Sequence, residues 1–150
     1  MTQLTKERLA VALGLAIITL SNVEGHFHPP FSIQWTPIFL VLIIAGINHP
    51  LYKSDFKLTA TYNFALLLFN DIFVRVYAGG THDDEGRDWI SLFFSGTFIL
   101  SAIAMLIYAA ASGKDADAGS RNKMRKQNAL TVAVSAVATV LIYCTFVSKI

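Results

Sequence analysis

Two short polar segments of the chain hold residue types that bind divalent metals. One is the stretch EGHFHPPF and the other is GGTHDDEGRDW. The candidate ligands are His26, His28, His82, Asp83, Asp84 and Glu85. Imidazole nitrogens together with a carboxylate oxygen are typical ligands of zinc and related ions. Both side chains of an extended His-x-His segment point to the same side, which suits chelation. We therefore expect a divalent metal site, such as a zinc site, where the two segments meet, with Glu24 orienting a histidine.

Two other interpretations of these segments stay open. In the first, the two segments are solvated polar loops, and their acidic residues have no role beyond keeping positive charge away from the outer face of the protein. Alternatively, the histidines form a pH-responsive cluster, because an unperturbed histidine titrates near pH 6.5. A bis-histidine haem is disfavoured because the histidines lie at the ends of apolar segments. No glycine-rich phosphate loop is present.

A second polar set interrupts an apolar segment that runs from residue 58 to residue 77. It comprises Asn63, Asn70, Asp71 and Arg75. At about 100° per residue the two asparagines fall on one stripe of a helix. Asp71 and Arg75 have the i, i+4 spacing of an ion pair. A charge inside a bilayer costs about 2.5–3.5 kcal/mol, so this pair is expected to face the protein interior.

Two roles fit this stripe. In the first, the ion pair is structural and the asparagines hydrogen-bond to neighbouring helices. In the second, the stripe lines a polar pathway or site that opens to one side of the membrane.

The composition places the chain in a membrane. Of its 150 residues 54% are hydrophobic and 15% are charged, whereas a soluble domain carries about 25% charged residues. This composition excludes a disordered chain, a basic nucleic-acid-binding domain and a conventional soluble enzyme. The single cysteine, Cys144, excludes an intramolecular disulfide. We expect Cys144 to be buried as a small apolar side chain.

Five apolar segments predict an all-α, polytopic bundle of five transmembrane helices, with residues 1–150 forming a single integral membrane domain. The expected spans are residues 8–23, 33–47, 58–77, 89–111 and 129–147. The first is expected to be retained, because no small-x-small cleavage pattern follows it. The second is the shortest, and its alternative is a re-entrant segment.

Basic residues predict the orientation of the bundle. Lys and Arg precede the first span, follow the second and fill the polar segment 112–127 after the fourth. Since basic loops stay on the inner side, the N-terminus is expected inside and the C-terminus outside a plasma or inner membrane. Segment 112–127 is expected to be an inner loop that contacts anionic lipid, or else a docking surface for a soluble partner.

These features leave three classes of function. Small size and small residues spaced four apart favour a non-catalytic subunit, scaffold or partner-binding component of a membrane assembly. Its partners would be the lipid bilayer and either other membrane subunits or further copies of this chain, with no nucleic acid. The second class is a metal- or proton-linked transporter or channel. It would use the polar stripe and the outer histidines His26, His28 and His82, which the expected topology places outside the membrane. The third is a membrane-embedded metal hydrolase in which Asp84 or Glu85 activates water.

Overall fold

The computed structural model describes residues 3–28, 35–43, 55–77, 84–114 and 116–150. Within these ranges the chain is helical and forms no strand. The helices are α1 (Gln3–Phe27), α3 (Thr36–Leu42), α5 (Phe56–Val76), α6 (Asp84–Ala111) and α7 (Ala118–Thr145), followed by a short 3-10 helix, η2 (Val147–Lys149).

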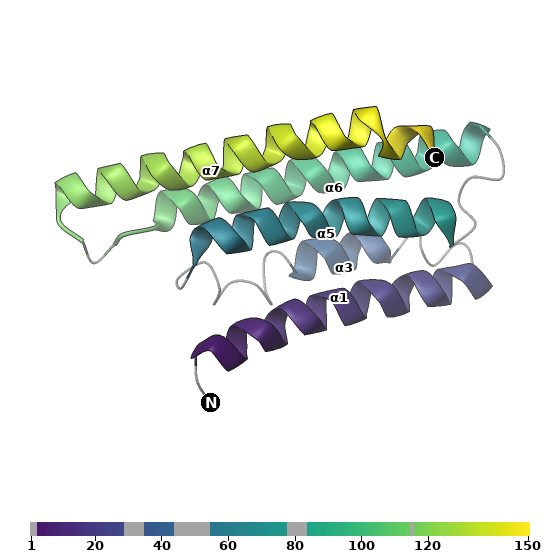
Figure 1. Ribbon diagram of the computed structural model, residues 1–150, viewed down its shortest axis with the longest axis horizontal. Coiled ribbons are helices and arrows are strands. Elements are labelled where there is room, and N and C mark those ends of the chain that lie inside the picture. The colour runs from purple at the N-terminus through teal and green to yellow at the C-terminus, as the bar shows by residue number, and fades with distance from the viewer. Residues whose placement is uncertain (1–2, 29–34, 44–54, 78–83, 115) are drawn as a thin grey trace.

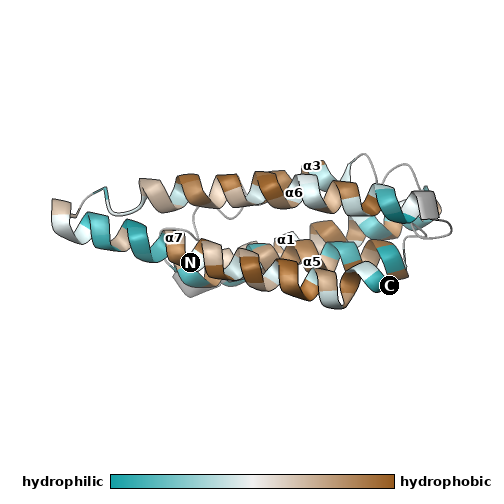
Figure 2. Ribbon diagram, turned by 90° about the horizontal axis from the view of Figure 1, so that it is seen from above, coloured by the Kyte–Doolittle hydropathy of each residue, from teal (hydrophilic) through white to brown (hydrophobic). Residues whose placement is uncertain are grey.

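The helices lie roughly along one axis and reverse direction from each to the next (Figure 1). The N- and C-termini therefore lie toward opposite ends of the bundle. Seen from above, α3 and α6 form one layer, and α1, α5 and α7 form the other (Figure 2). Helix α5 contacts α1, α6 and α7, while α3 contacts α1 and α6. Helix α5 is thus the central element to which most of the bundle is attached.

Aspartate caps begin two of the helices. The side chain of Asp55 accepts a hydrogen bond from the Leu58 amide at 2.9 Å at the start of α5. Asp117 accepts one from the Ser120 amide at 3.0 Å at the start of α7. The hydrogen bonds from Ser120 lower the pKa of the Asp117 carboxyl group. Each cap satisfies one of the amide groups that a helix N-terminus leaves without an intrahelical acceptor.

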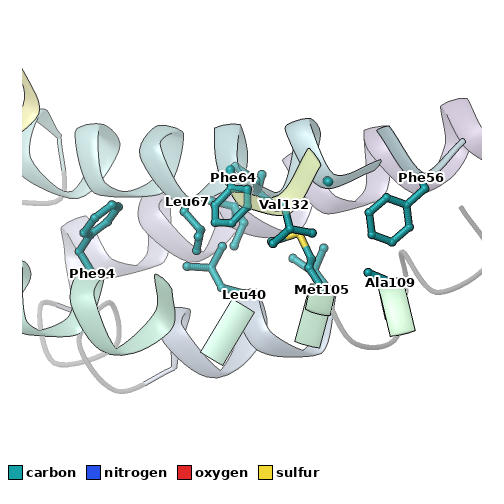
Figure 3. Packing of buried hydrophobic residues seen from close by; sticks show 12 residues of the cluster. Leu40, Phe56, Phe64, Leu67, Phe94, Met105, Ala109 and Val132 are labelled. Carbon is teal, nitrogen blue, oxygen red and sulfur yellow. The ribbon is translucent and has the colours of Figure 1, made fainter. Parts of the chain in front are cut away.

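The core is apolar and includes buried side chains from α1, α3, α5, α6 and α7, with Ile18 as the contribution of α1. Figure 3 shows Leu40 of α3, Phe64 and Leu67 of α5, Phe94 and Met105 of α6 and Val132 of α7 packed together. Phe64 is the largest of the fully buried side chains, with 1% of its surface exposed. The central position of α5 follows from this packing, because its apolar face is covered from several sides.

The helix boundaries agree with some of the expected apolar segments and differ from others. Helix α5 agrees with the segment 58–77 to within two residues at each end. Helix α1 is longer than 8–23, and α6 begins at Asp84 rather than at residue 89. Of the segment 33–47, the structure describes only residues 35–43, and the seven-residue helix α3 is about 10 Å long. Whether that segment crosses a membrane stays a prediction.

The segment 112–127 was expected to be a loop, but most of it is helical, while its placement on the inner side stays a prediction. Helix α7 begins at Ala118, so the basic residues that follow are helical. The cause is local: Asp117 caps the helix, and Arg, Lys, Met and Gln are good helix formers. A hydropathy pattern marks only where a helix becomes apolar. The helix itself starts eleven residues before residue 129, where the expected span begins, because its first turns are polar.

Among the described residues, three helical stretches are long and apolar enough to cross a membrane: Arg8–Phe27, Gly86–Ala111 and Ala118–Lys149. Helix α5 has 21 residues, which span about 31 Å, but its asparagines, aspartate and arginine lower its mean hydropathy. Large apolar side chains lie on the outside of the bundle, including Leu20, Ile107 and Leu130, each more than 60% exposed. Cys144 is also exposed, contrary to expectation, because it lies on the outward side of α7.

Helices α1 and α5 approach closely at Gly14. The Tyr62 hydroxyl group of α5 lies over this glycine and donates a hydrogen bond to the Val11 carbonyl oxygen at 3.0 Å. A Cβ at position 14 would overlap with the Tyr62 hydroxyl oxygen and lie 3.3 Å from a methyl group of Ile43. Glycine therefore leaves room here for the Tyr62 side chain.

Replacing Gly14 by alanine is expected to destabilise the bundle by about 1–3 kcal/mol, because the Tyr62 ring must move and its hydrogen bond to Val11 is lost. Reversible unfolding in detergent, followed by circular dichroism, measures the change. Gly96→Ala on α6 is the matched control, since a Cβ there meets nothing within 4 Å. This control is expected to be neutral or to stabilise by up to about 1 kcal/mol. Equal losses for the two variants would contradict a specific close approach at Gly14.

Candidate functional site

The described charged groups of α5 that lie deepest in the bundle form an ion pair. The Nε of Arg75 donates a hydrogen bond to Oδ2 of Asp71 at 2.6 Å. Asp71 is 3% exposed and Arg75 is 4% exposed. The i, i+4 spacing predicted this pair, and the structure confirms it.

The guanidinium group of Arg75 also joins α5 to two other helices. Its Nη2 donates to the hydroxyl oxygen of Ser91 on α6 and to that of Tyr143 on α7, both at 3.0 Å. The Tyr143 ring stacks on Phe94, with ring centroids 4.0 Å apart and planes 3° from parallel. Cζ of Arg75 lies 5.7 Å from the centroid of the Tyr143 ring, within range of a cation–π interaction. The arrangement therefore fixes α5, α6 and α7 against one another at one place.

Neutral polar side chains attach α1 to the same region. The Nδ2 of Asn22 donates to Oδ1 of Asn70 on α5 at 2.9 Å. Next to it, the hydroxyl groups of Ser21 and Thr36 share a hydrogen bond between α1 and α3. The expected hydrogen bond between an asparagine of the stripe and a neighbouring helix is thus confirmed for Asn70, which accepts it from Asn22, and Asn63 is fully buried.

Sequence reasoning missed the partners of the stripe, which are Asn22, Ser91 and Tyr143. Asn22 gave one usable signal, since it is an amide near the end of an apolar segment. Ser91 and Tyr143 gave none, because serine and tyrosine are common in membrane helices and only the rotation of each helix decides what they contact.

A small cavity lies beside the ion pair, between α3, α5 and α6. Its volume is about 30 Å³, enough for one or two water molecules. Asn70, Asp71 and Thr97 supply its polar lining, and the walls are apolar, with Leu40 and Phe93 among them. The Asp71 carboxylate therefore borders a space that water can fill. The expected polar pathway along α5 stays a prediction.

The described histidines each have an oxygen partner. Nδ1 of His26 donates to the Tyr77 carbonyl oxygen at 2.8 Å, and the two rings stack with centroids 4.7 Å apart. Nδ1 of His28 lies 2.8 Å from a carboxylate oxygen of Glu24, so Glu24 does orient a histidine. The expectation of an extended His-x-His segment is wrong. Helix α1 continues through Phe27, and the His28 amide still bonds to the Glu24 carbonyl oxygen at 2.8 Å.

The remaining candidate ligands are only partly described. Asp84 and Glu85 begin α6, at the end of the bundle where α1 finishes (Figure 1). His82 and Asp83 lie outside the described residues. In the described part of the chain, no three His, Cys, Asp or Glu side chains gather to form a metal site. The structure therefore brings His26 close to the end of α5, and the six-residue metal site stays a prediction.

No protein-family model matches the chain, and comparisons with curated proteins and with solved structures gave no match. The function is therefore inferred from the geometry and from the chemistry of the residues.

Removing one partner of the buried ion pair is expected to destabilise the bundle strongly. Asp71→Asn leaves the Arg75 charge buried without its counter-ion, a change that typically costs about 3–5 kcal/mol. The double variant Asp71→Leu/Arg75→Met removes both charges and is expected to recover most of the lost stability. Unfolding in detergent measures the free energy of unfolding of the unmodified protein, of Asp71→Asn and of the double variant. Ser91→Ala is a milder variant, because it removes only one acceptor of Arg75. A double variant as unstable as Asp71→Asn would contradict a coupled pair.

Proposed function

We propose that the protein is a small integral membrane protein that acts as a non-catalytic, partner-binding component of a membrane assembly. The proposed topology has five crossings, with the N-terminus inside and the C-terminus outside. The reversal of direction from each helix to the next agrees with this alternation (Figure 1). The proposed partners are the bilayer and either other membrane subunits or further copies of this chain.

The observation that supports the proposal best is the exposed apolar side of α7, which no other helix of the described structure covers. Only 17% of its most apolar stretch is buried, compared with 28% in α1 and in α6. Leu130, Val134, Val137 and Leu141 are each about 60% exposed. Their spacing of four, three and four residues places them on one face of the helix, as in the contact seam of paired helices.

Small side chains border this face. Ala133 and Ala138 are exposed on either side of it. Lipid provides no hydrophobic driving force for helix association, so close packing at small residues contributes much of the attraction between membrane helices. We infer that the α7 face defined by Leu130, Val134, Val137 and Leu141 binds a transmembrane helix of a partner.

The interior of the bundle fits a structural role. Arg75, Asp71 and Asn70 are used in contacts that hold the helices together. A bundle held together by such contacts presents a defined surface to a partner at a low cost in conformational entropy.

Cys144 provides the test, because it is the single cysteine of the chain and lies exposed near the end of this face. Oxidative cross-linking in native membranes is expected to give an adduct, whose mass distinguishes a second copy of this 16.5 kDa chain from another subunit. Val137→Trp should reduce the yield by disturbing the α7 face. Ile103→Trp, on the exposed side of α6, should leave it unchanged.

Two results would overturn the proposal. Release of the chain from membranes by alkaline carbonate would exclude an integral membrane protein. A single-chain mass in mild detergent, together with no adduct in membranes, would exclude a stable partner on α7.

A metal- or proton-linked transporter is the second candidate function, and two observations favour it. His26 and His28 both use Nδ1 in contacts with oxygen atoms, which leaves each Nε2 for a further ligand. Histidines that bind metals usually donate their other ring N–H group to a carbonyl or carboxylate oxygen in this way. In addition, the carboxylate of Asp71 borders the small cavity.

If the outer histidines hold a metal, the variant His26→Gln/His28→Gln is expected to bind zinc at least about tenfold more weakly. Calorimetry with zinc alone measures this affinity in detergent. His49→Gln is the control, because the sequence places His49 on the opposite side of the membrane. Absence of zinc binding by the unmodified protein would remove the metal-linked form of this candidate.

A further inference from the structure

A cluster of positive charge lies at the beginning of α7. Residues 112–128 contain five basic and two acidic side chains. The basic residues are Lys114, Arg121, Lys123, Arg125 and Lys126. The first turns of α7 extend past the ends of the neighbouring helices (Figure 1) and are hydrophilic (Figure 2). The charge therefore lies on a projecting helical surface.

The two arginines and the lysines have different roles in this cluster. Arg121 donates to the Ala116 carbonyl oxygen at 3.2 Å and Arg125 donates to that of Ser112 at 3.4 Å, so both face the turn between α6 and α7. Lys123 and Lys126 lie on the opposite side of the helix, and both are exposed. Lys114, in the turn itself, is also exposed.

Carboxylates do not neutralise these side chains in the described part of the chain. Neither of the ion pairs found there involves a residue of this cluster. The carboxylate of Asp117 is engaged in capping, because it accepts the Ser120 amide. The side chains of all three lysines are exposed.

The distance between these lysines and the apolar face of α7 indicates what kind of partner they contact. The exposed α7 face begins at Leu130, four residues after Lys126 and seven after Lys123, or about 6 and 10 Å along the helix. If Leu130 lies at the edge of the hydrocarbon core, Lys126 and Lys123 lie at the level of the lipid headgroups. Met124, between them in sequence and 41% exposed, adds an apolar contact near this level.

We propose that Lys114, Lys123 and Lys126 form a binding surface for the headgroups of anionic phospholipids. The inference rests on the proposed insertion of α7 in a membrane and adds a lipid preference to it. The capped helix α7 carries Lys123 and Lys126, and Lys114 lies in the turn before it. At the membrane surface their charges attract phosphate groups. Since the contact is electrostatic and exposed, salt should weaken it.

The test compares lipid binding by the whole protein in nanodiscs and by native mass spectrometry, with phosphatidylglycerol and phosphatidylcholine as probes. Lys114→Gln/Lys123→Gln/Lys126→Gln is expected to lower the preference for phosphatidylglycerol by about fivefold for each charge removed. The single variant Lys126→Gln should show one such step. Replacement of the same three residues by arginine should restore the preference, since it restores the charge.

Lys149→Gln at the other end of the bundle serves as the control and should have a smaller effect than Lys126→Gln. An unchanged preference in the triple glutamine variant would overturn the inference, even with the protein still embedded. Loss of a protein partner with lipid binding intact would overturn it in favour of an acidic protein. Release of the unmodified chain by alkaline carbonate would instead show that the proposed function fails.

Discussion

The arrangement of the helices depends on the hydrogen bonds that the guanidinium group of Arg75 makes. It bonds to Asp71 within α5, to Ser91 on α6 and to Tyr143 on α7. A buried charge without a partner is costly, so helix rotations that break these bonds are disfavoured. The directions of the hydrogen bonds therefore restrict how α6 and α7 pack against α5. Apolar packing alone would leave this rotation less well defined, since dispersion forces have little directional preference.

The polar contacts are concentrated at one end of the bundle. Ser21 and Asn22 lie near the end of α1, Asn70 and Arg75 near the end of α5, and Ser91 near the start of α6. The other end depends more on apolar packing, with Phe56, Met105 and Ala109 in the core. A hydrogen bond between Asn128 and Ser112 at 3.0 Å links α6 and α7 there. The end near Arg75 is thus held by a buried ion pair, whereas partly buried hydrogen bonds add to the apolar packing at the other end.

Local patterns were predictable from the sequence and relations between helices were not. The Asp71–Arg75 pair follows from i, i+4 spacing, and the limits of α5 follow from its apolar run. The partners of Arg75 depend on helix rotation, which no local pattern contains. The start of α7 was misjudged because hydropathy does not detect a polar helical extension. The conformation at His26 was misjudged because α1 continues through Gly25, which a helix tolerates at a modest cost, as far as Phe27. The metal site remains a prediction, since His82 and Asp83 lie outside the described residues.

The contact between Gly14 and Tyr62 has a consequence for how this sequence can diverge. The phenol group occupies the space that a side chain at position 14 would need. A larger residue at 14 becomes acceptable once position 62 has lost its hydroxyl group or its ring. Homologous chains should therefore show correlated substitution at these positions, although they are 48 residues apart in the sequence. Such a correlation would indicate, from homologous sequences alone, that α1 and α5 lie close together at these positions.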